Sequence, residues 1–202
     1  MRLLNSRTSL SPRLPVLVGV SLLLSATFAS AQTTQPSTSP TDPFPAGTWT
    51  LNLTSQYVNG CPGGRHDQFF GGAFGASYYL FDRFAIIGDL PFYYIDQREG
   101  ADAVAGGFEL LARWHFATID KLTLYIDGGA GMLLADNRVP VDGTNFNFTP
   151  QFGLGATYQL SDDLFLESGA RIYHLSNAGI DPGVNPSINY ALEGYVGLLF
   201  KL

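Results

Sequence analysis

The sequence predicts an all-β protein, an eight-stranded antiparallel up-and-down transmembrane β-barrel. Three observations predict this fold. Apolar and polar residues alternate with a period of two, most alternating segments run ten residues or more, and tight connections alternate with longer ones. A tilted strand needs about 9–11 residues to cross a membrane, and such barrels carry short turns at one end and longer loops at the other.

Composition excludes several classes of protein. The chain has 202 residues, of which 46% are hydrophobic and 14% charged, which is too apolar for a disordered protein. Its single cysteine, Cys61, excludes an internal disulfide framework and a cysteine-based zinc cluster. The formal net charge of −6 argues against a nucleic-acid partner, which would require clustered Lys and Arg side chains.

The first 31 residues have the pattern of a secretory signal peptide. Arg2, Arg7 and Arg13 form a basic start, and the apolar run Leu14–Leu24 is too short to span a membrane as a helix. Small residues before Ala31 predict cleavage after that position. We therefore expect the protein to function outside the cytoplasm.

Two further regions follow the signal peptide. Residues 32–46 are rich in Pro, Ser and Thr, which predicts a loose linker. Residues 47–202 form the expected barrel. We assign its strands to eight alternating segments, at about 47–58, 67–81, 84–96, 104–116, 121–135, 145–160, 164–177 and 189–202. An eight-stranded barrel has an interior that side chains fill, which excludes a wide pore.

Six charged residues share the parity that faces the barrel interior. They are Glu109, Arg113, Asp127, Glu167, Arg171 and Glu193. We expect these side chains to form a buried ion-pair network that plugs the lumen. A soluble, lipocalin-like barrel would reverse the two faces, but the apolar parity is almost free of Lys and Glu, which favours lipid outside.

The seventh segment departs from the lipid-facing pattern near its end. Leu166, Ala170 and Ile172 define the lipid-facing parity, and the same parity then places His174 and Ser176 outside. Residues i and i+2 on a strand share a face at about 6.6–6.8 Å between Cα atoms, so these two side chains are within reach of each other. Such a pair suits nucleophilic catalysis, with Ser176 as nucleophile and His174 as general base. The plain alternative is that both side chains lie in the headgroup layer.

The wider motif favours catalysis. Residues 171–180 read Arg-Ile-Tyr-His-Leu-Ser-Asn-Ala-Gly-Ile, and residues 185–189 read Asn-Pro-Ser-Ile-Asn. The two stretches resemble the lipid A 3-O-deacylase (PagL-like) family of eight-stranded outer-membrane barrels. The resemblance implies hydrolysis of the ester-linked acyl chain at position 3 of lipid A, with His174 as base and Ser176 as nucleophile. It implies no metal and no cofactor.

The resemblance also suggests the remaining site residues. Asn185, or alternatively Asn177, would bind the oxyanion, and Gly179 would leave backbone N–H groups accessible. Asn189 occupies the position of the family's acidic residue, where its carbonyl could orient the imidazole without stabilising the positive charge. We therefore expect a slower enzyme than one that carries Glu. The alternative carboxylates, Asp181 and Glu193, do not match the motif.

These features predict a serine esterase of the outer membrane that acts on lipid A or lipopolysaccharide in the outer leaflet. The alternative is a non-catalytic small barrel with a structural or adhesive role, in which the motif is a relic. The amide at Asn189 in place of an acid keeps this alternative open.

Overall fold

The computed structural model describes residues 42–60, 67–181, 184 and 188–202. The signal peptide, Cys61 and Asn185 lie outside these residues. Within them the chain forms nine strands: β1 (Trp49–Gly60), β2 (Gln68–Phe81), β3 (Phe84–Asp96), β4 (Ala103–Ile119), β5 (Leu122–Val139), β6 (Thr144–Phe148), β7 (Gln151–Gln159), β8 (Leu164–Leu175) and β9 (Ile188–Lys201).

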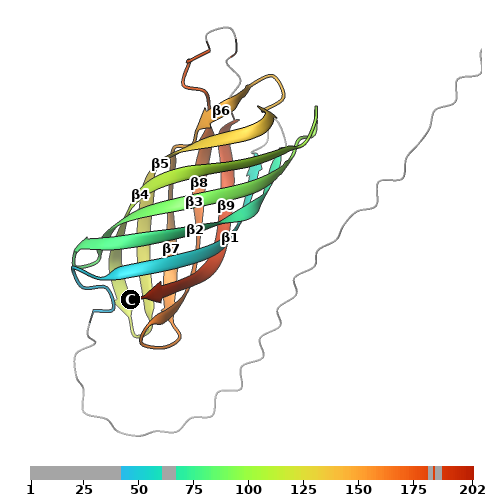
Figure 1. Cartoon of the computed structure of the whole chain (residues 1–202). Helices are drawn as coiled ribbons and strands as arrows, with labels where there is room; N and C mark the ends of the chain where they lie inside the picture. Colours follow the sequence, from blue (N-terminus) through green and yellow to red (C-terminus); the bar gives the residue numbers. More distant parts are fainter. Residues whose placement is uncertain (1–41, 61–66, 182–183, 185–187) are drawn as a thin grey trace, which may run out of the picture. The chain divides into compact units, whose positions relative to one another are not determined.

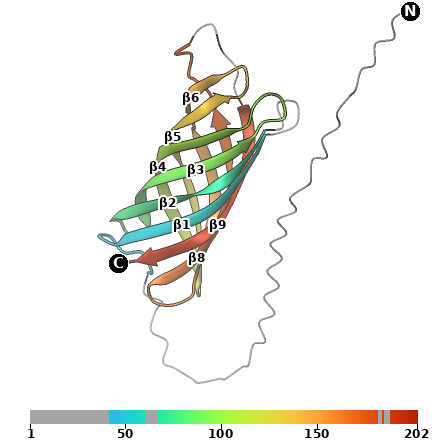
Figure 2. The same ribbon diagram turned by 45° about the vertical axis from the view of Figure 1, so that its right-hand side comes forward.

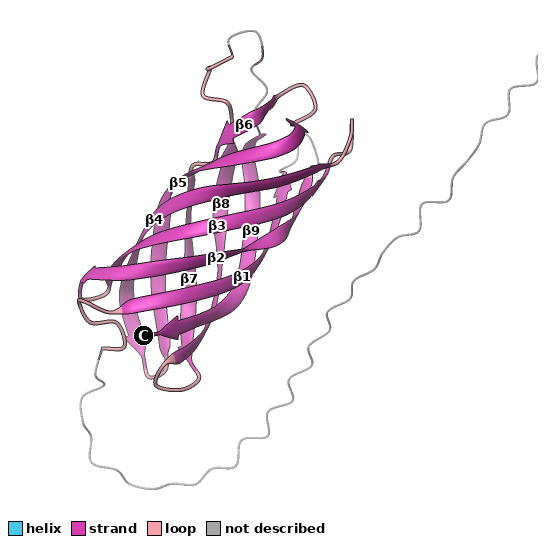
Figure 3. Ribbon diagram, in the orientation of Figure 1, coloured by secondary structure: helices cyan, strands magenta, loops and turns pink. Residues whose placement is uncertain are grey.

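The strands close into an all-antiparallel barrel (Figure 1). β1 pairs with β2 on one side and with β9 on the other, and Figure 2 shows these first and last strands side by side. β6 and β7 both pair with β5, one after the other along its length, and together they form the sixth of eight barrel strands. The predicted fold class is therefore confirmed. The described part of the chain contains strands and loops (Figure 3), and no helix in it is long and apolar enough to cross a membrane.

The predicted sixth strand, 145–160, is divided in the structure. Thr149 and Pro150 separate β6 from β7 because proline has no backbone N–H to donate to a sheet. The ladder continues around the break, since Thr149 and Gly131 exchange two backbone hydrogen bonds. The carbonyl of Pro150 accepts a hydrogen bond from the N–H of His174, at 3.0 Å.

The predicted loop 136–144 is mostly strand. β5 continues to Val139, and the chain turns back through residues 140–143 into β6. The side chain of Asn147 stabilises this turn by donating to the carbonyl of Val139 at 3.0 Å. The hairpin therefore extends the barrel wall at one end, where β5 and β6 are visible in Figure 1.

The two faces of the sheet have opposite polarity. Large apolar side chains cover the outside, among them Leu53, Phe74, Leu90, Trp114, Leu154 and Ile172, which are all more than half exposed. The six charged residues expected inside are all buried. A soluble barrel would expose its polar face, so this arrangement excludes the lipocalin-like alternative and is that of a lipid-facing barrel.

Five of those six residues form the expected ion-pair network. Asp127 lies at its centre, and its carboxylate accepts hydrogen bonds from Arg113 and Arg171, each at 2.9 Å from a terminal guanidinium nitrogen. Arg113 also pairs with Glu167 at 2.9 Å, and Arg171 with Glu193 at 3.0 Å. The prediction is wrong for Glu109, whose carboxylate is buried but forms no ion pair among the described residues. The two arginines are already occupied by the three carboxylates nearer to them.

The last residues of the predicted linker are packed against the barrel. Phe44 is fully buried, and its ring centroid lies 4.5 to 5.0 Å from those of His115, Phe165 and Tyr79. The N–H of Arg83 donates to the carbonyl of Phe44 at 2.9 Å, and the Arg83 side chain pairs with Asp42. One aromatic side chain of this proline-rich stretch therefore belongs to the packed core at this end of the barrel.

Replacing Phe44 by alanine is expected to lower the free energy of unfolding by about 3–5 kcal/mol, because it removes a fully buried aromatic ring. Urea unfolding of the barrel in detergent micelles measures the change. Pro45→Ala, at an exposed neighbouring position, is the control and should change stability little. Equal unfolding midpoints for the two variants would contradict the packing of Phe44.

Candidate active site

His174 and Ser176 lie on the outward side of the barrel wall, at the end of β8. Tyr173 and Leu175 are fully buried inside, whereas Ile172 is 56% exposed outside. His174 and Ser176 share the parity of Ile172 and are half-buried. The outward placement expected from the alternation is confirmed, and both polar side chains are therefore reached from the lipid side.

The backbone of this segment is held by the broken sixth strand. The N–H of Ser176 donates to the carbonyl of Phe148 at 3.1 Å, and the N–H of Phe148 donates to the carbonyl of Ser176 at 2.7 Å. The hydrogen bond from the backbone N–H of His174 to the carbonyl of Pro150 holds the backbone two positions before Ser176. A rigid strand backbone thus carries both residues, which suits a site that needs fixed geometry. Pro150 within an alternating segment is the sequence signal for this arrangement, and the prediction of one continuous strand missed it.

A β-bulge lies opposite His174. Tyr173 pairs with Ala191 and Leu175 pairs with Ile188, so one residue of β8 faces two residues of β9. Those two residues are Asn189 and Tyr190. A bulge re-aims a side chain and is frequent next to active sites. The structure therefore brings the backbone of Asn189 beside that of His174.

Asn177 holds the loop that follows Ser176. Its side chain is 2% exposed, its amide nitrogen donates to the carbonyl of Val184 at 2.6 Å, and its oxygen accepts from the N–H of Gly179 at 2.9 Å. Ala178 and Gly179 both have positive φ, of 51° and 75°. The left-handed conformation disfavours Ala178, so the loop stores strain beside the serine, as functional sites often do.

These hydrogen bonds involve two of the groups predicted to bind the oxyanion. The amide donor of Asn177 and the N–H of Gly179 are both engaged within the loop, which makes Asn177 a positioning residue in this structure. Asn185 lies outside the described residues. Among the alternative carboxylates, Glu193 is excluded as a partner of His174 because it is fully buried in the lumen and pairs with Arg171. Asp181 lies exposed in the same loop.

Asn177→Ala should loosen this loop without unfolding the barrel. Each lost hydrogen bond to a buried partner contributes about 1–3 kcal/mol. Amide exchange at Gly179 should then accelerate on the order of 5- to 160-fold, and hydrogen-exchange mass spectrometry of the peptide 177–184 measures it. Asn145→Ala, the same change in the hairpin between β5 and β6, is the control. Unchanged exchange in the 177–184 peptide would show that Asn177 does not hold the loop.

Among the described residues, no group of three His, Cys, Asp or Glu side chains is placed to hold a metal ion.

Comparisons with known proteins agree with the fold. The crystal structure of Neisserial surface protein A (NspA) is similar at a TM-score of 0.57 and 16% identity, over 77% of this chain and 96% of that chain. The outer membrane protein OprG from Pseudomonas aeruginosa is similar at a TM-score of 0.56 and 12% identity, over 79% and 97% of the two chains. The crystal structure of the outer membrane enzyme PagL has 20% identity over 76% and 98% of the two chains, at a TM-score of 0.48. A sequence comparison with curated proteins gives no significant match.

The closed sheet, its apolar outer wall and its charged interior define an outer-membrane β-barrel. The sequence model of one family, lipid A 3-O-deacylase (PagL), matches residues 47–195. The chain belongs to this family, and the resemblance seen in the motif at residues 171–189 is confirmed.

Proposed function

We propose that the protein is an esterase that removes the 3-O-linked acyl chain from lipid A in the outer leaflet. The observation that carries this proposal is the outward placement of His174, near the end of β8, and of Ser176, just after it, in a member of the lipid A 3-O-deacylase family. Polar side chains facing hydrocarbon are unfavourable, and a lipid substrate that reacts at this position accounts for them.

The proposed chemistry follows from the residue types. The hydroxyl of Ser176 attacks the ester carbonyl carbon while His174 accepts its proton, and the tetrahedral intermediate collapses to an acyl-enzyme with release of the sugar hydroxyl. Water activated by His174 then hydrolyses the acyl-enzyme and releases the fatty acid. The amide of Asn185 would stabilise the oxyanion, and a donor of this kind contributes about 3–4 kcal/mol.

The filled interior of the barrel determines the side from which a lipid substrate approaches the site. The network around Asp127 fills the lumen, so a bulky glycolipid does not reach the site from within. An ester at the level of the outer rim reaches Ser176 from the bilayer. In this scheme the side-chain carbonyl of Asn189 would orient the imidazole of His174, which is supported by the register that brings the backbones of β8 and β9 together at these residues.

The test is mass spectrometry of lipid A after incubation with the refolded protein. The wild type should remove one 3-hydroxyacyl chain, and Ser176→Ala should slow this loss by about 10³-fold or more. Ser168→Ala is the matched control, because Ser168 is an exposed serine on the same strand and face, eight positions from Ser176. Loss of a secondary acyl chain instead would overturn the assigned position. Equal activity in Ser176→Ala and the wild type would overturn the nucleophile.

The second candidate function is a non-catalytic barrel with a structural or adhesive role. It is favoured by one observation, the amide of Asn189 at the position where the family motif carries an acid. A folded wild-type barrel that leaves several lipid A species unchanged would support it.

A further inference from the structure

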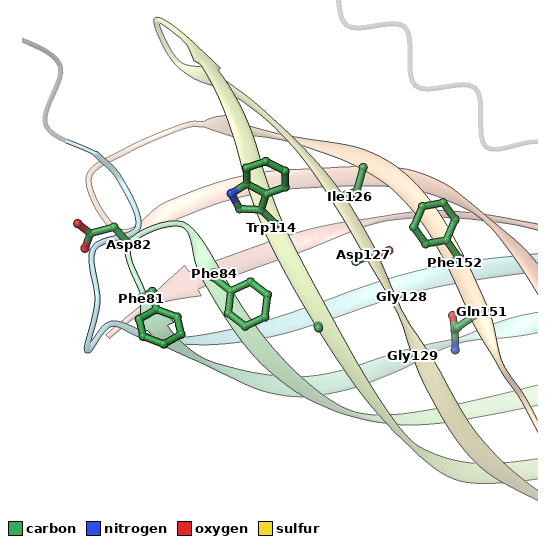
Figure 4. Close-up of a pocket in the computed structure, with 11 residues that line it drawn as sticks. Phe81, Asp82, Phe84, Trp114, Ile126, Asp127, Gly128, Gly129, Gln151 and Phe152 are labelled. Atoms are coloured by element: carbon green, nitrogen blue, oxygen red, sulfur yellow. The ribbon is translucent and has the colours of Figure 1, made fainter.

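A groove of about 870 Å³ opens on the outer wall of the barrel, across β3, β4, β5 and β7. Ala112 and Gly128 pair across β4 and β5, and Gly128 pairs in turn with Phe152 of β7. Ala112, Gly128 and Phe152 therefore form one row across three strands, in which two small residues lie beside a large one. Aromatic side chains border the hollow, and Figure 4 shows Phe84, Trp114 and Phe152 around it. The groove exists because Ala112 and Gly128 leave unfilled the space that large side chains occupy elsewhere on this face.

One end of the groove lies at the tight turn between β2 and β3, where Phe81 and Asp82 line it. This end of the barrel also carries the C-terminal residue, whose N–H donates to the carbonyl of Trp49 at 3.0 Å. An even strand count and short turns mark it as the periplasmic end. His174 and Ser176 lie at the opposite end of the barrel, so the Asp82 end of the groove lies in the inner leaflet. The other end of the groove, at Phe152, lies beside Ile172, two positions before His174.

The residues that line the groove indicate which class of ligand it can bind. An apolar hollow facing hydrocarbon loses van der Waals contacts unless a chain fills it. Asp82 is exposed at the interfacial end, and one of its carboxylate oxygens accepts the N–H of Ala46 at 2.8 Å. A carboxylate beside an apolar groove complements a cation attached to an acyl chain.

We propose that this groove is a binding site for an inner-leaflet phospholipid with an amine headgroup. One acyl chain lies over Ala112 and Gly128 between the aromatic side chains, and the ammonium group lies beside Asp82. The headgroup end of this site does not depend on the proposed esterase, because Asp82 lies at the opposite end of the barrel from His174 and Ser176.

The sequence provides a reporter in the groove. Trp49 and Trp114 are the two tryptophans of the chain, so the variant Trp49→Phe leaves Trp114 as the only one. Its fluorescence is measured in vesicles of phosphatidylcholine that contain increasing fractions of phospholipid brominated on the acyl chains. Brominated phosphatidylethanolamine should reach half-maximal quenching at a mole fraction about two- to fivefold lower than brominated phosphatidylglycerol, the ratio expected for one interfacial ion pair.

Four variants in the Trp49→Phe background separate the contribution of the headgroup from that of the groove. Asp82→Asn should remove the preference for the amine, and Ala112→Leu should remove selective quenching because it fills the hollow. Ala156→Leu, the same enlargement at a lipid-facing position outside the groove, should retain the wild-type preference. Ser176→Ala should also retain it, which distinguishes this site from the proposed esterase.

Two results would overturn the proposal. Equal half-quenching fractions for the two headgroups would mean that Trp114 meets only ordinary surrounding lipid. Displacement of the brominated phospholipid by added lipid A would mean that the groove holds an acyl chain of the glycolipid instead.

Discussion

Replacing Asn189 by glutamate is expected to raise the rate of lipid A deacylation by at least about tenfold, with an upper bound of about 10⁴ set by acid-to-amide replacement in a Ser-His-Asp triad. The bulge places the backbone of Asn189 beside His174. An amide at this position can orient the imidazole, but only a carboxylate also stabilises the imidazolium that forms as Ser176 attacks.

The measurement is the initial rate of fatty-acid release from lipid A by wild type and variant. Asn189→Gln has the same length as the glutamate variant without its charge and is the matched control. The double variant His174→Ala with Asn189→Glu should lose the gain, because the carboxylate acts through the imidazole. A rate for Asn189→Glu no higher than that of Asn189→Gln would show that residue 189 does not act on His174.

Replacing Asp127 by alanine is expected to destabilise the barrel by about 3–5 kcal/mol, because it removes a buried partner of two cations. The carboxylate of Asp127 binds Arg113 and Arg171, and all three side chains are at most 4% exposed. Glu167 and Glu193 each retain only one arginine and cannot replace it.

Urea unfolding of the barrel in micelles measures this loss. Asp163→Ala is the control: it removes the same charge from an exposed pair, in which Asp163 lies 3.9 Å from Lys201. An exposed pair contributes about 0–1 kcal/mol, so the control should unfold near the wild-type midpoint. If the two variants unfold at the same urea concentration, the buried network does not stabilise the barrel.

The alternation of apolar and polar residues was sufficient to predict the barrel and its two faces. Side chains on a strand point to opposite sides with a strict period of two, so parity alone assigned Arg171 and Glu193 to the interior and His174 and Ser176 to the lipid side. The residue types in the motif were sufficient to suggest the chemistry and the family.

Only the tertiary structure decided which residues lie beside that motif. Three features join segments that meet only when the barrel closes. They are the backbone hydrogen bonds between Phe148 and Ser176, the bulge opposite His174 and the packing of Phe44. Parity along one strand carries no information about the register of the next strand. The same limit explains Glu109, because its parity predicted burial, whereas its lack of an ion-pair partner depends on which carboxylates lie closer to the two arginines.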